Sequence, residues 1–357
     1  MKKGIKIALW LFLGLILVAG VYFWIVFGSF VKGALSVEKL DEGLYYMEYK
    51  GDDGFDELIA KGGGRNTTEL SEYIMSFLSN GFYNSPSPTS PSAKPGCSAL
   101  TVRTPDKEIL MGRNFDFMSA TGIILHTIPK TGYETITTFN VEFLGFGEGW
   151  LPEGFANQYK ALAVLFLALD GFNEKGLAIA DLTAGDGVQT HQNTGKPALT
   201  TTSATCYLLK NAATVDEALE LLRGIDMNSD IGIAHHYAIA DATGKSVVVE
   251  YVDNQMVFVE SPAVANHYLC EAKHNVGLIH GDNRYEQLCQ RYVETDGIMN
   301  LQQLKEAIFS VSQPQRGNNF LGTAWTMVMD LTNRTVTYYS RRHFDKPFYF
   351  ELSRTKE

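Results

Sequence analysis

Residues 97–116 read CSALTVRTPDKEILMGRNFD, two largely apolar runs on either side of Thr104-Pro105-Asp106-Lys107. Pro and Asp favour a tight turn, so the pattern predicts a hairpin with strands at Ser98–Arg103 and Glu108–Arg113. If the chain reverses near Pro105, residue 97 lies opposite residue 113 or 114, and facing Cβ atoms in such a pair are about 5 Å apart.

This hairpin would bring Cys97 beside Arg113, with Asp116 just beyond the strand end at the same corner. A guanidinium stabilises a thiolate, which matters because a free thiol has a pKa of about 8.5. If Cys97 were also a free N-terminus, its own α-amine could act as the base and Asp116 could hold the ammonium. The hairpin alone equally allows a buried strand thiol beside a surface Arg113–Asp116 ion pair.

The chain further along alternates hairpins with blocks of helix. Short connections favour antiparallel pairing of the strands that they join, and apolar residues at helical spacing predict helices. The expected strand pairs are Ala161–Leu169 with Leu177–Leu182, Tyr237–Asp241 with Ser246–Tyr251, and Trp325–Leu331 with Val336–Ser340. The expected helices are Thr68–Leu78, Thr202–Asn211, Val215–Arg223 and Leu301–Ser310. Strands and helices segregated in this way predict an α+β fold with antiparallel sheets.

Upstream of Cys97 the composition changes twice. Residues 33–83 form a small acidic segment, and residues 84–95 read NSPSPTSPSAKP, a Pro/Ser-rich stretch typical of an exposed linker. The linker ends directly before Gly96-Cys97. It could be a plain connection between two parts of the chain, or a segment at which the Gly96–Cys97 bond is cut.

The N-terminus has the pattern of a membrane anchor. Lys2, Lys3 and Lys6 precede an uncharged run from Ile7 to Val31, which is long enough to cross a bilayer core of about 30 Å. The run is longer than the apolar part of a signal peptide and has no small-residue cleavage pattern, which favours a retained signal anchor at residues 7–31. The lysines predict a cytoplasmic tail at residues 1–6 and an extracytoplasmic location for everything after residue 32.

Composition excludes several classes of function. The formal net charge is -10 and no basic stripe is present, which argues against a nucleic-acid partner. The four cysteines form no CxxC pair, and no HExxH, Walker or GxGxxG motif occurs, so we expect neither a metal nor a cofactor. One disulfide among Cys206, Cys270 and Cys289 stays possible outside the cytoplasm.

Several motifs together resemble the choloylglycine hydrolase family of linear amide hydrolases, in the N-terminal-nucleophile superfamily. They occur in the family's order: CSALTV at residues 97–102, GRNFD at 112–116, FNEKGLA at 172–178, ADATGKS at 240–246 with Glu250, ANHY at 265–268 and DNRY at 282–285. The ANHYL run and a Gly-Cys cut after a long pro-segment are more similar to the isopenicillin N acyltransferase and acid-ceramidase branches.

The resemblance implies a four-layer αββα fold with two facing antiparallel sheets. It implies a catalytic domain at residues 97–357 and a pro-segment with linker at residues 32–96, which blocks the amine until Cys97 attacks the preceding carbonyl and could stay docked afterwards. The implied site consists of the nucleophile Cys97, Arg113 and Asp116 around it, the backbone N–H of Thr183 and the side chain of Asn266 for the oxyanion, and Arg284 as the last active-site arginine.

The implied activity is hydrolysis of the linear amide of an N-acyl small molecule, activated by self-cleavage at Gly96-Cys97. Bile-salt-like, ceramide-like and penicillin-like amides all share that bond, and an outward-facing anchored enzyme suits an amphiphilic substrate. Two alternatives stay open: an acyltransferase that passes the acyl group to an amine, and an inert membrane-tethered binding domain. Adjacent His235 and His236 should point to opposite faces of a strand. His267 could protonate a leaving group or be structural, and Phe139–Trp150 could line a pocket or pack on the core.

Overall fold

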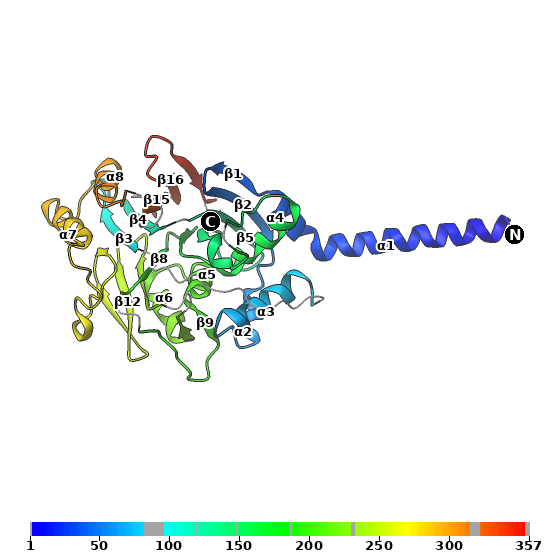
Figure 1. The fold of residues 1–357 in the computed structure, drawn as a ribbon, viewed down its shortest axis with the longest axis horizontal. Coiled ribbons are helices and arrows are strands. Elements are labelled where there is room, and N and C mark those ends of the chain that lie inside the picture. The colour runs from blue at the N-terminus through cyan, green and yellow to red at the C-terminus, as the bar shows by residue number, and fades with distance from the viewer. Residues whose placement is uncertain are drawn as a thin grey trace.

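The computed structural model describes residues 2–81, 96–118, 120–147, 149–185, 188–229, 233–314 and 322–353. Figure 1 shows a single long helix, α1 (Lys2–Leu35), that projects from a body in which all other elements gather. The predicted linker at residues 84–95 lies outside the described residues.

The body is built on two large sheets. The nine-stranded sheet has the order β1-β2-β5-β6-β7-β8-β11-β12-β13, and the six-stranded sheet has the order β14-β3-β4-β15-β16-β17. The strands of the first are Glu38–Asp41, Leu44–Gly51, Gly122–Pro129, Thr135–Asn140, Asp170–Asn173, Ala178–Thr183, His235–Ala240, Ser246–Val252 and Gln255–Glu260. Those of the second are Ala263–Val264, Gly96–Arg103, Ile109–Phe117, Gly322–Asp330, Thr335–Ser340 and Phe348–Glu351.

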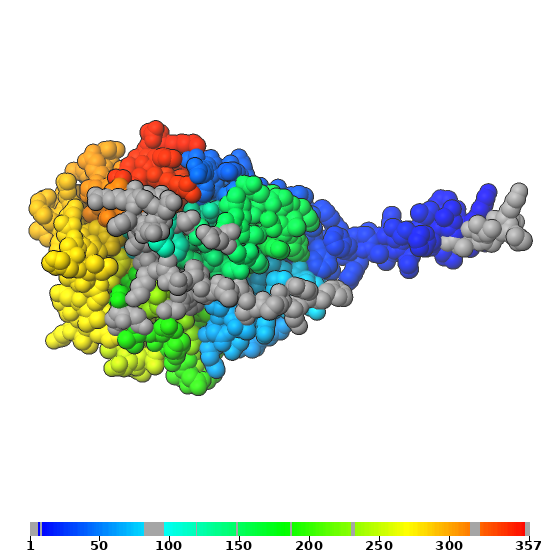
Figure 2. All heavy atoms as spheres, in the orientation of Figure 1, coloured from blue at the N-terminus to red at the C-terminus, as the bar shows by residue number. Residues whose placement is uncertain are grey.

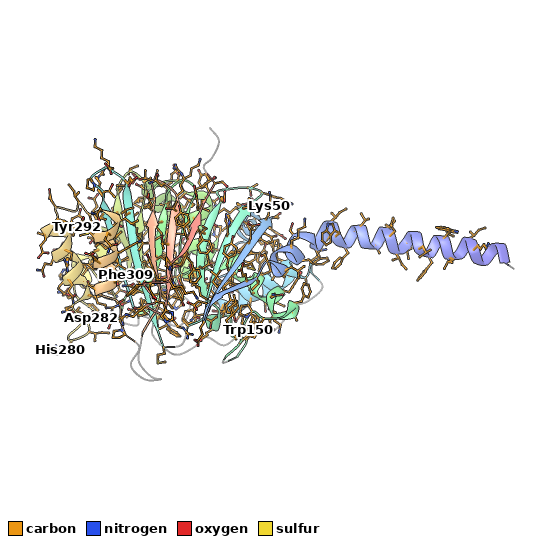
Figure 3. The ribbon with its side chains drawn as sticks, turned by 90° about the horizontal axis from the view of Figure 1, so that it is seen from above. Lys50, Trp150, His280, Asp282, Tyr292 and Phe309 are labelled. Atoms are coloured by element: carbon orange, nitrogen blue, oxygen red, sulfur yellow. The ribbon has the colours of Figure 1, made fainter. Side chains whose placement is uncertain are left out.

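Helices cover the outer faces of both sheets, which gives the four αββα layers. Helix α5 (Thr201–Asn211) packs on the nine-stranded sheet with α6 (Val215–Arg223) against it, and α7 (Arg284–Glu294) and α8 (Leu301–Ser310) pack on the six-stranded sheet. Seen from above in Figure 3, the strands stand side by side in the middle of the body. One apolar cluster fills the space between the sheets, and a second, which includes Leu100, Leu288 and Ile308, lies under α7 and α8.

The GRN motif explains how α8 reaches the sheet. A Cβ atom at Gly112 would lie 2.3 Å from Cγ1 of Ile308, so only glycine lets this helix approach the strand so closely. Asn114 then fixes the contact, since its Nδ2 donates to the Ile308 carbonyl over 2.8 Å and its Oδ1 accepts from the Thr326 hydroxyl over 2.6 Å.

The predicted helices are confirmed: α3 (Thr67–Leu78), α5, α6 and α8 lie within one residue of the expected bounds. The first hairpin and the last two are confirmed as β3–β4, β11–β12 and β15–β16. The strand expected at Ala161–Leu169 is wrong, because α4 (Phe155–Ala161) and a 3-10 turn at Leu162–Phe166 occupy that run. A short apolar run does not distinguish a buried strand from a buried helix.

The segment before Cys97 contributes regular structure to the body. Strand β2 lies between β1 and β5, and it pairs with β5 in parallel along its whole length, from Leu44↔Gly122 to Gly51↔Pro129. This pair departs from the otherwise antiparallel pattern of the two large sheets. A six-residue helix, α2 (Phe55–Ala60), and then α3 follow, and they bury Phe55, Leu58, Leu70 and Ile74.

Helix α1 has two parts. Its described side chains between Ile7 and Ile25 are exposed, whereas from Val26 onward the helix packs against the body, with Phe30, Gly33 and Ala34 buried. Within the described residues, one helix, over Leu9–Leu35, is long and apolar enough to cross a membrane. A signal sequence near the N-terminus would have the same properties.

Candidate active site

The backbone of Cys97 is held on both sides by side chains from distant segments. Cys97 is the second residue of β3 and is fully buried. Its N–H donates to Oδ1 of Asn266 over 2.7 Å, and its carbonyl accepts from Nη1 of Arg284 over 2.9 Å. The cysteine that the sequence singled out therefore lies in a network of polar side chains that binds its backbone on both sides. A cysteine that only filled the core would not require side-chain partners of this kind.

Arg284 is the hub of this network. It is the first residue of α7, and its guanidinium also donates to Oδ2 of Asp116 over 2.8 Å and to Oδ1 of Asn266 over 2.9 Å. Asp282, two residues earlier, accepts from Nε over 2.9 Å and from Nη2 over 2.6 Å. The Arg284 guanidinium thus connects Asp116 of β4 and Asn266, which follows β14, to the backbone of Cys97 near the start of β3.

Asn266 follows β14 and reaches across to the end of β8. Its Nδ2 lies 3.0 Å from the carbonyl oxygen and 2.7 Å from the hydroxyl of Thr183. Because the Cys97 N–H and the Arg284 guanidinium both donate to the other amide atom, that atom must be the oxygen. In this uncleaved chain the amide of Asn266 therefore couples Thr183 to Cys97.

Arg113 lies on the same face of the sheet as Cys97, but the expected register is wrong by one or two residues. Cys97 pairs with Phe115, and Arg113 pairs with Ala99. The turn is centred one residue later than Pro105, which shifts each pair. Since side chains alternate along a strand, residues 97 and 113 still point into the same space between the sheets.

Three groups hold the buried guanidinium of Arg113. Its Nε lies 2.8 Å from Oδ2 of Asp170, and its Nη2 donates to the Asp181 carbonyl over 3.2 Å. The Trp325 indole donates to the same Asp170 oxygen over 2.9 Å, and its ring centroid lies 6.0 Å from the guanidinium carbon. Nη1 of Arg113 has no hydrogen-bond partner among the described residues.

Asp116 lies within β4, opposite Gly96, and not beyond the strand end as expected. Its Oδ1 accepts from the Thr323 hydroxyl over 2.6 Å, and its Oδ2 accepts from Arg284. A surface Arg113–Asp116 ion pair is therefore wrong, because both residues are buried and each has another partner. A Cβ atom at position 96 would lie 3.2 Å from Cβ of Asp116, so the residue before Cys97 has little room.

Residues 97–268, just under half of the chain, match the family model of the linear amide C-N hydrolases, choloylglycine hydrolase family. A penicillin V acylase of Pectobacterium atrosepticum is 31% identical over 103 residues, which are 26% of this chain and 27% of that protein. A bile salt hydrolase/transferase of Clostridium perfringens is 28% identical over 170 residues, 45% of this chain and 49% of that protein. The chain thus spans half or less of the length of these curated relatives.

Solved structures confirm the fold of the choloylglycine hydrolase family. A mutant conjugated bile acid hydrolase from Clostridium perfringens superposes with a TM-score of 0.53 at 18% identity, over 72% of this chain and 92% of the other. A penicillin V acylase from Agrobacterium tumefaciens gives 0.51 at 17% identity, over 72% and 86%. The N-terminal-nucleophile architecture expected from the motifs is therefore the fold of this protein.

Burial dominates the electrostatics around Cys97 in the intact chain. It raises the pKa of the Cys97 thiol to about 11, while the charges of Arg113 and Arg284 lower it and those of Asp116 and Asp181 raise it. Burial likewise raises the pKa of Asp116, against the nearby Arg284. The thiol is therefore protonated at neutral pH while residue 96 is still attached.

Three histidines next to the site contact neighbouring residues. His235 and His236 point to opposite faces of β11, as expected: the first lies 2.8 Å from Asp181 and the second 3.3 Å from Glu250 and 2.9 Å from the Ala265 carbonyl. Glu250 also accepts from the N–H groups of residues 269 and 270, so it holds the loop that carries Asn266. Burial lowers the pKa of His267, whose ring packs edge-on against Tyr285.

Other sequence candidates have structural places too. Phe139 and Phe143 of the aromatic stretch pack in the core, and Phe146 pairs with Trp150 nearer the surface. All four cysteines are free thiols, so the disulfide left open above is absent. No group of His, Cys, Asp or Glu that could hold a metal occurs in the part of the chain that the structure describes.

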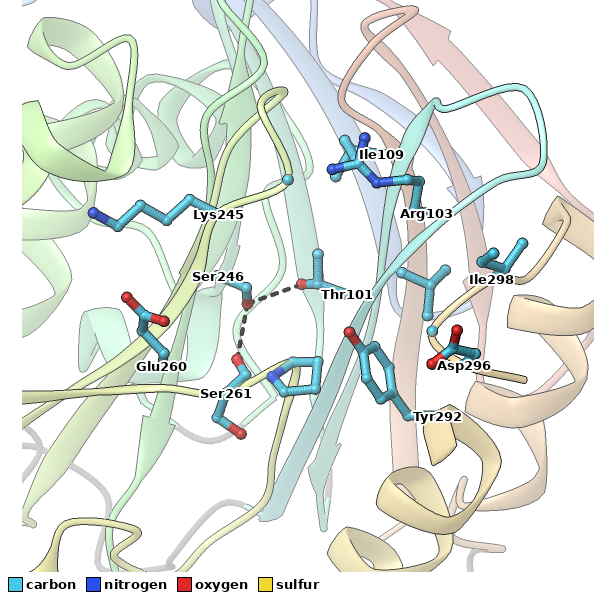
Figure 4. Close-up of a pocket in the computed structure, with 14 residues that line it drawn as sticks. Thr101, Arg103, Ile109, Lys245, Ser246, Glu260, Ser261, Tyr292, Asp296 and Ile298 are labelled. Atoms are coloured by element: carbon cyan, nitrogen blue, oxygen red, sulfur yellow. Dashed lines mark hydrogen bonds between the residues drawn. The ribbon is translucent and has the colours of Figure 1, made fainter. Parts of the chain in front are cut away.

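A cavity of about 710 Å³ lies at the opposite end of β3 from Cys97. Figure 4 shows Arg103, Lys245 and Tyr292 around it, and Ser246, whose hydroxyl donates to the Ser261 carbonyl over 2.9 Å and lies 3.4 Å from the Thr101 hydroxyl. None of the six predicted site residues lines this cavity.

Sequence reasoning missed Asp170, Asp181, Asp282, Thr323 and Trp325, which hold the predicted residues in place. One signal could have found the first of them. An arginine in a strand buried on both faces needs a carboxylate partner, and Asp170 stands directly before the apolar Gly171-Phe172 of another buried strand.

Proposed function

We propose that this protein is a membrane-anchored amidase that cleaves the linear amide C–N bond of an N-acyl small molecule with the thiol of Cys97. The observation that carries the proposal is the environment of Cys97, whose backbone N–H and carbonyl are both bound by buried site residues, Asn266 and Arg284. The backbone groups of a structural cysteine in a strand would ordinarily pair with a neighbouring strand, whereas those of Cys97 are held by side chains, which suits a residue that becomes an N-terminal nucleophile.

Activation would be a self-cleavage at Gly96-Cys97. The Cys97 sulfur attacks the Gly96 carbonyl carbon, the C–N bond breaks, and the Cys97 nitrogen leaves as an amine, which gives a thioester. Water then hydrolyses the thioester, and the products are a C-terminal carboxylate on Gly96 and a free thiol on Cys97. The hydrogen bond from the Cys97 nitrogen to Asn266 would orient the departing nitrogen.

Cleavage would also change the state of the thiol. Burial is the largest cause of its high pKa, and the loss of residue 96 would admit water and leave an α-amine of ordinary pKa, about 7.7 to 8.0, next to the sulfur. That amine is the base of the proposed mechanism, with Asp116 and Asn266 at hand to hold it. Arg113, whose Nη1 is unpaired among the described residues, would stabilise the thiolate or the substrate.

In the proposed turnover, the thiolate attacks the substrate carbonyl and the amine proton passes to the leaving nitrogen. Nδ2 of Asn266 and the N–H of Thr183 would hold the oxyanion, so the hydrogen bond that now joins these residues would give way to the substrate. Water then releases the acid and restores the thiol. Transfer of the acyl group to an amine is the second candidate, since one relative is named as a hydrolase/transferase.

The N-terminal fragment would stay bound after the cut. Strand β2 is paired on both edges, and the buried Lys210 ammonium lies 2.6 Å from Oδ1 of Asp53, on the segment before the cut. The fragment would then keep the catalytic domain at the membrane through α1, with the domain on the extracytoplasmic side. Such an anchored site favours an amphiphilic amide of bile-salt-like, ceramide-like or penicillin-like type.

The test is an intact-mass measurement on purified wild type and Cys97→Ala, with Cys206→Ala as the control for another buried cysteine. We expect wild type and the control to yield two co-eluting fragments divided before residue 97, and Cys97→Ala to stay whole and inactive against a panel of N-acyl amides. An uncut and fully active wild type would falsify the proposal. Product analysis with an added amine separates hydrolysis from transfer, because only transfer forms a new amide.

A further inference from the structure

A groove of about 460 Å³ lies where α1 enters the body of the protein. One wall comes from α1, through Ile25, Val26, Ser29 and Phe30. The other comes from β2, α2, α3 and the residues that follow them, together with Lys130 directly after β5. Figures 1 and 2 show α2 and α3, in light blue, on the side of the body from which α1 projects. None of the predicted active-site residues lines this groove.

The position of the groove along α1 corresponds to the headgroup layer of a bilayer. The exposed helix from Ile7 to Ile25 is about 28 Å long at 1.5 Å per residue, which is close to the ~30 Å hydrocarbon core. The groove begins at Ile25 and extends to Phe30, about 7.5 Å further along the same axis. Headgroup layers add roughly 5–8 Å on each side of the core.

The lining of the groove contains both apolar and charged side chains. Ile25, Val26 and Phe30 are apolar, and Phe77 packs edge-on against Phe30 with ring centroids 5.3 Å apart. Two cations and two carboxylates form the polar part: Lys61, Lys130, Asp52 and Glu57. An amphiphile with its chain beside α1 and a polar head against these residues would match both parts.

The charged residues of the groove indicate which kind of lipid headgroup would fit. Two lysines and two acids give the groove no net charge, so a head with both a phosphate and an ammonium group fits better than a purely anionic one. Lys130 has no ion pair with the described residues and is free to bind a phosphate, while Lys61 already pairs with Glu57 over 2.7 Å. Asp52 has no ion pair with the described residues and suits an ammonium, whereas the Lys61 ammonium already lies 5.5 Å from the centroid of the Tyr73 ring.

We propose that this groove binds one phospholipid with a zwitterionic ammonium headgroup, and that the bound lipid fixes the catalytic domain on the membrane surface. The inference rests on the proposed membrane anchoring of α1. It does not depend on cleavage at Cys97, because every lining residue precedes that bond or lies within the catalytic domain in the uncleaved chain. Helix α1 continues into the body without a break, so an occupied groove would set the orientation of the domain and not only its distance from the bilayer.

The experiment uses the full-length uncleaved Cys97→Ala protein in nanodiscs with equal amounts of phosphatidylethanolamine and phosphatidylglycerol. Native mass spectrometry counts the lipids that stay bound after release. We expect one retained phosphatidylethanolamine, and a loss of about tenfold or more in its occupancy when Lys61→Glu and Lys130→Glu are combined. Ser76→Trp, which fills the groove without changing its charge, should have the same effect.

The matched control is Lys305→Glu, another lysine near a tyrosine ring, at 5.8 Å from Tyr339 compared with 5.5 Å for Lys61 and Tyr73. It should leave lipid retention unchanged. Equal retention in all variants, or a preference for phosphatidylglycerol, would overturn the groove assignment while leaving the anchor intact. Recovery of the wild-type chain in the soluble fraction after membranes are washed with alkaline carbonate would instead overturn the anchor, and the groove with it.

Discussion

Replacing Lys210 with Met should destabilise the contact between the segment before Cys97 and the rest of the body. The Lys210 side chain is only 4% exposed, and its ammonium lies 2.6 Å from Asp53 and 3.1 Å from Asp56. Methionine keeps most of the apolar stem and removes the charge, which leaves the Asp53 carboxylate buried without a cation. Removing one partner of a buried ion pair costs about 3–5 kcal/mol of unfolding free energy.

The expected shift in melting temperature follows from the size of the protein. An unfolding entropy of about 2 cal/mol/K per residue over roughly 300 residues converts this loss into a decrease of about 5–8 °C. Scanning calorimetry of the uncleaved Cys97→Ala protein in detergent measures it. Lys305→Met, a lysine on the surface of α8, is the control and should change the free energy by less than about 0.5 kcal/mol.

The loss of unfolding free energy in Lys210→Met should depend on pH. Burial raises the pKa of Asp53, against the hydrogen bond and charge of Lys210, so without Lys210 the folded-state pKa rises further. A carboxyl with a raised folded pKa costs stability as pH rises from its unfolded pKa, about 3.9, through its folded pKa. The deficit of Lys210→Met should therefore be smaller at pH 4.5 than at pH 7.5.

The double variant Asp53→Asn with Lys210→Met should recover most of the loss, because no unpaired charge is then buried. In the cleaved protein, the single variant should release its N-terminal fragment at a lower denaturant concentration than the wild type. A deficit below about 1 kcal/mol at pH 7.5, or a double variant no more stable than the single one, would refute a stabilising role of this ion pair in the uncleaved chain.

Three further outcomes are expected. Asp170→Asn should cost about 3–5 kcal/mol in chemical denaturation, because it leaves the buried Arg113 guanidinium without its carboxylate; an unchanged midpoint would contradict this. Asn173→Ala should cost roughly 2–5 kcal/mol, since its side chain makes four hydrogen bonds to backbone groups. Burial raises the pKa of Glu250, but hydrogen bonds from His236 and from two backbone N–H groups outweigh the effect of burial, so the pKa is lowered. This stabilisation is present above about pH 4.3 and lost as pH falls through the folded pKa, so the decrease in urea midpoint caused by Glu250→Gln should be largest at pH 7 and become smaller as the pH falls below about 4.3.

The parts of the fold that depend on local pattern were predictable from the sequence. Helix α6 follows from its apolar spacing, and the hairpins β3–β4, β11–β12 and β15–β16 follow from short turns between apolar runs. Strands β1, β2, β5 and β6 were not predicted, because β2 pairs with β5 across a long connection and no short-range signal marks such a pair. The order of the strands in the sheets likewise depends on contacts distant in sequence.

The same distinction applies to the site. The six predicted residues came from motif order, and Cys97, Asp116, Asn266, Thr183 and Arg284 do form one connected network. Arg113 belongs to a neighbouring network through Asp170 and Trp325. The sequence could not give these partners, because Asp170 and Trp325 occur on different sheets and meet only when the two sheets face each other.

The position of β2 determines what a cut before Cys97 would do to the stability of the protein. Removal of residues 1–96 would expose the whole length of β5, whose Ile123, Ile124 and Leu125 are buried in the intact sheet. An exposed apolar edge strand is a site of aggregation, since its unpaired backbone groups recruit other chains. A released catalytic domain would therefore carry a new hydrophobic edge, whereas a fragment that stays in place keeps β5 paired. If the chain is cut before Cys97 as proposed, the fold thus favours two pieces that remain a complex, with α1 as part of it.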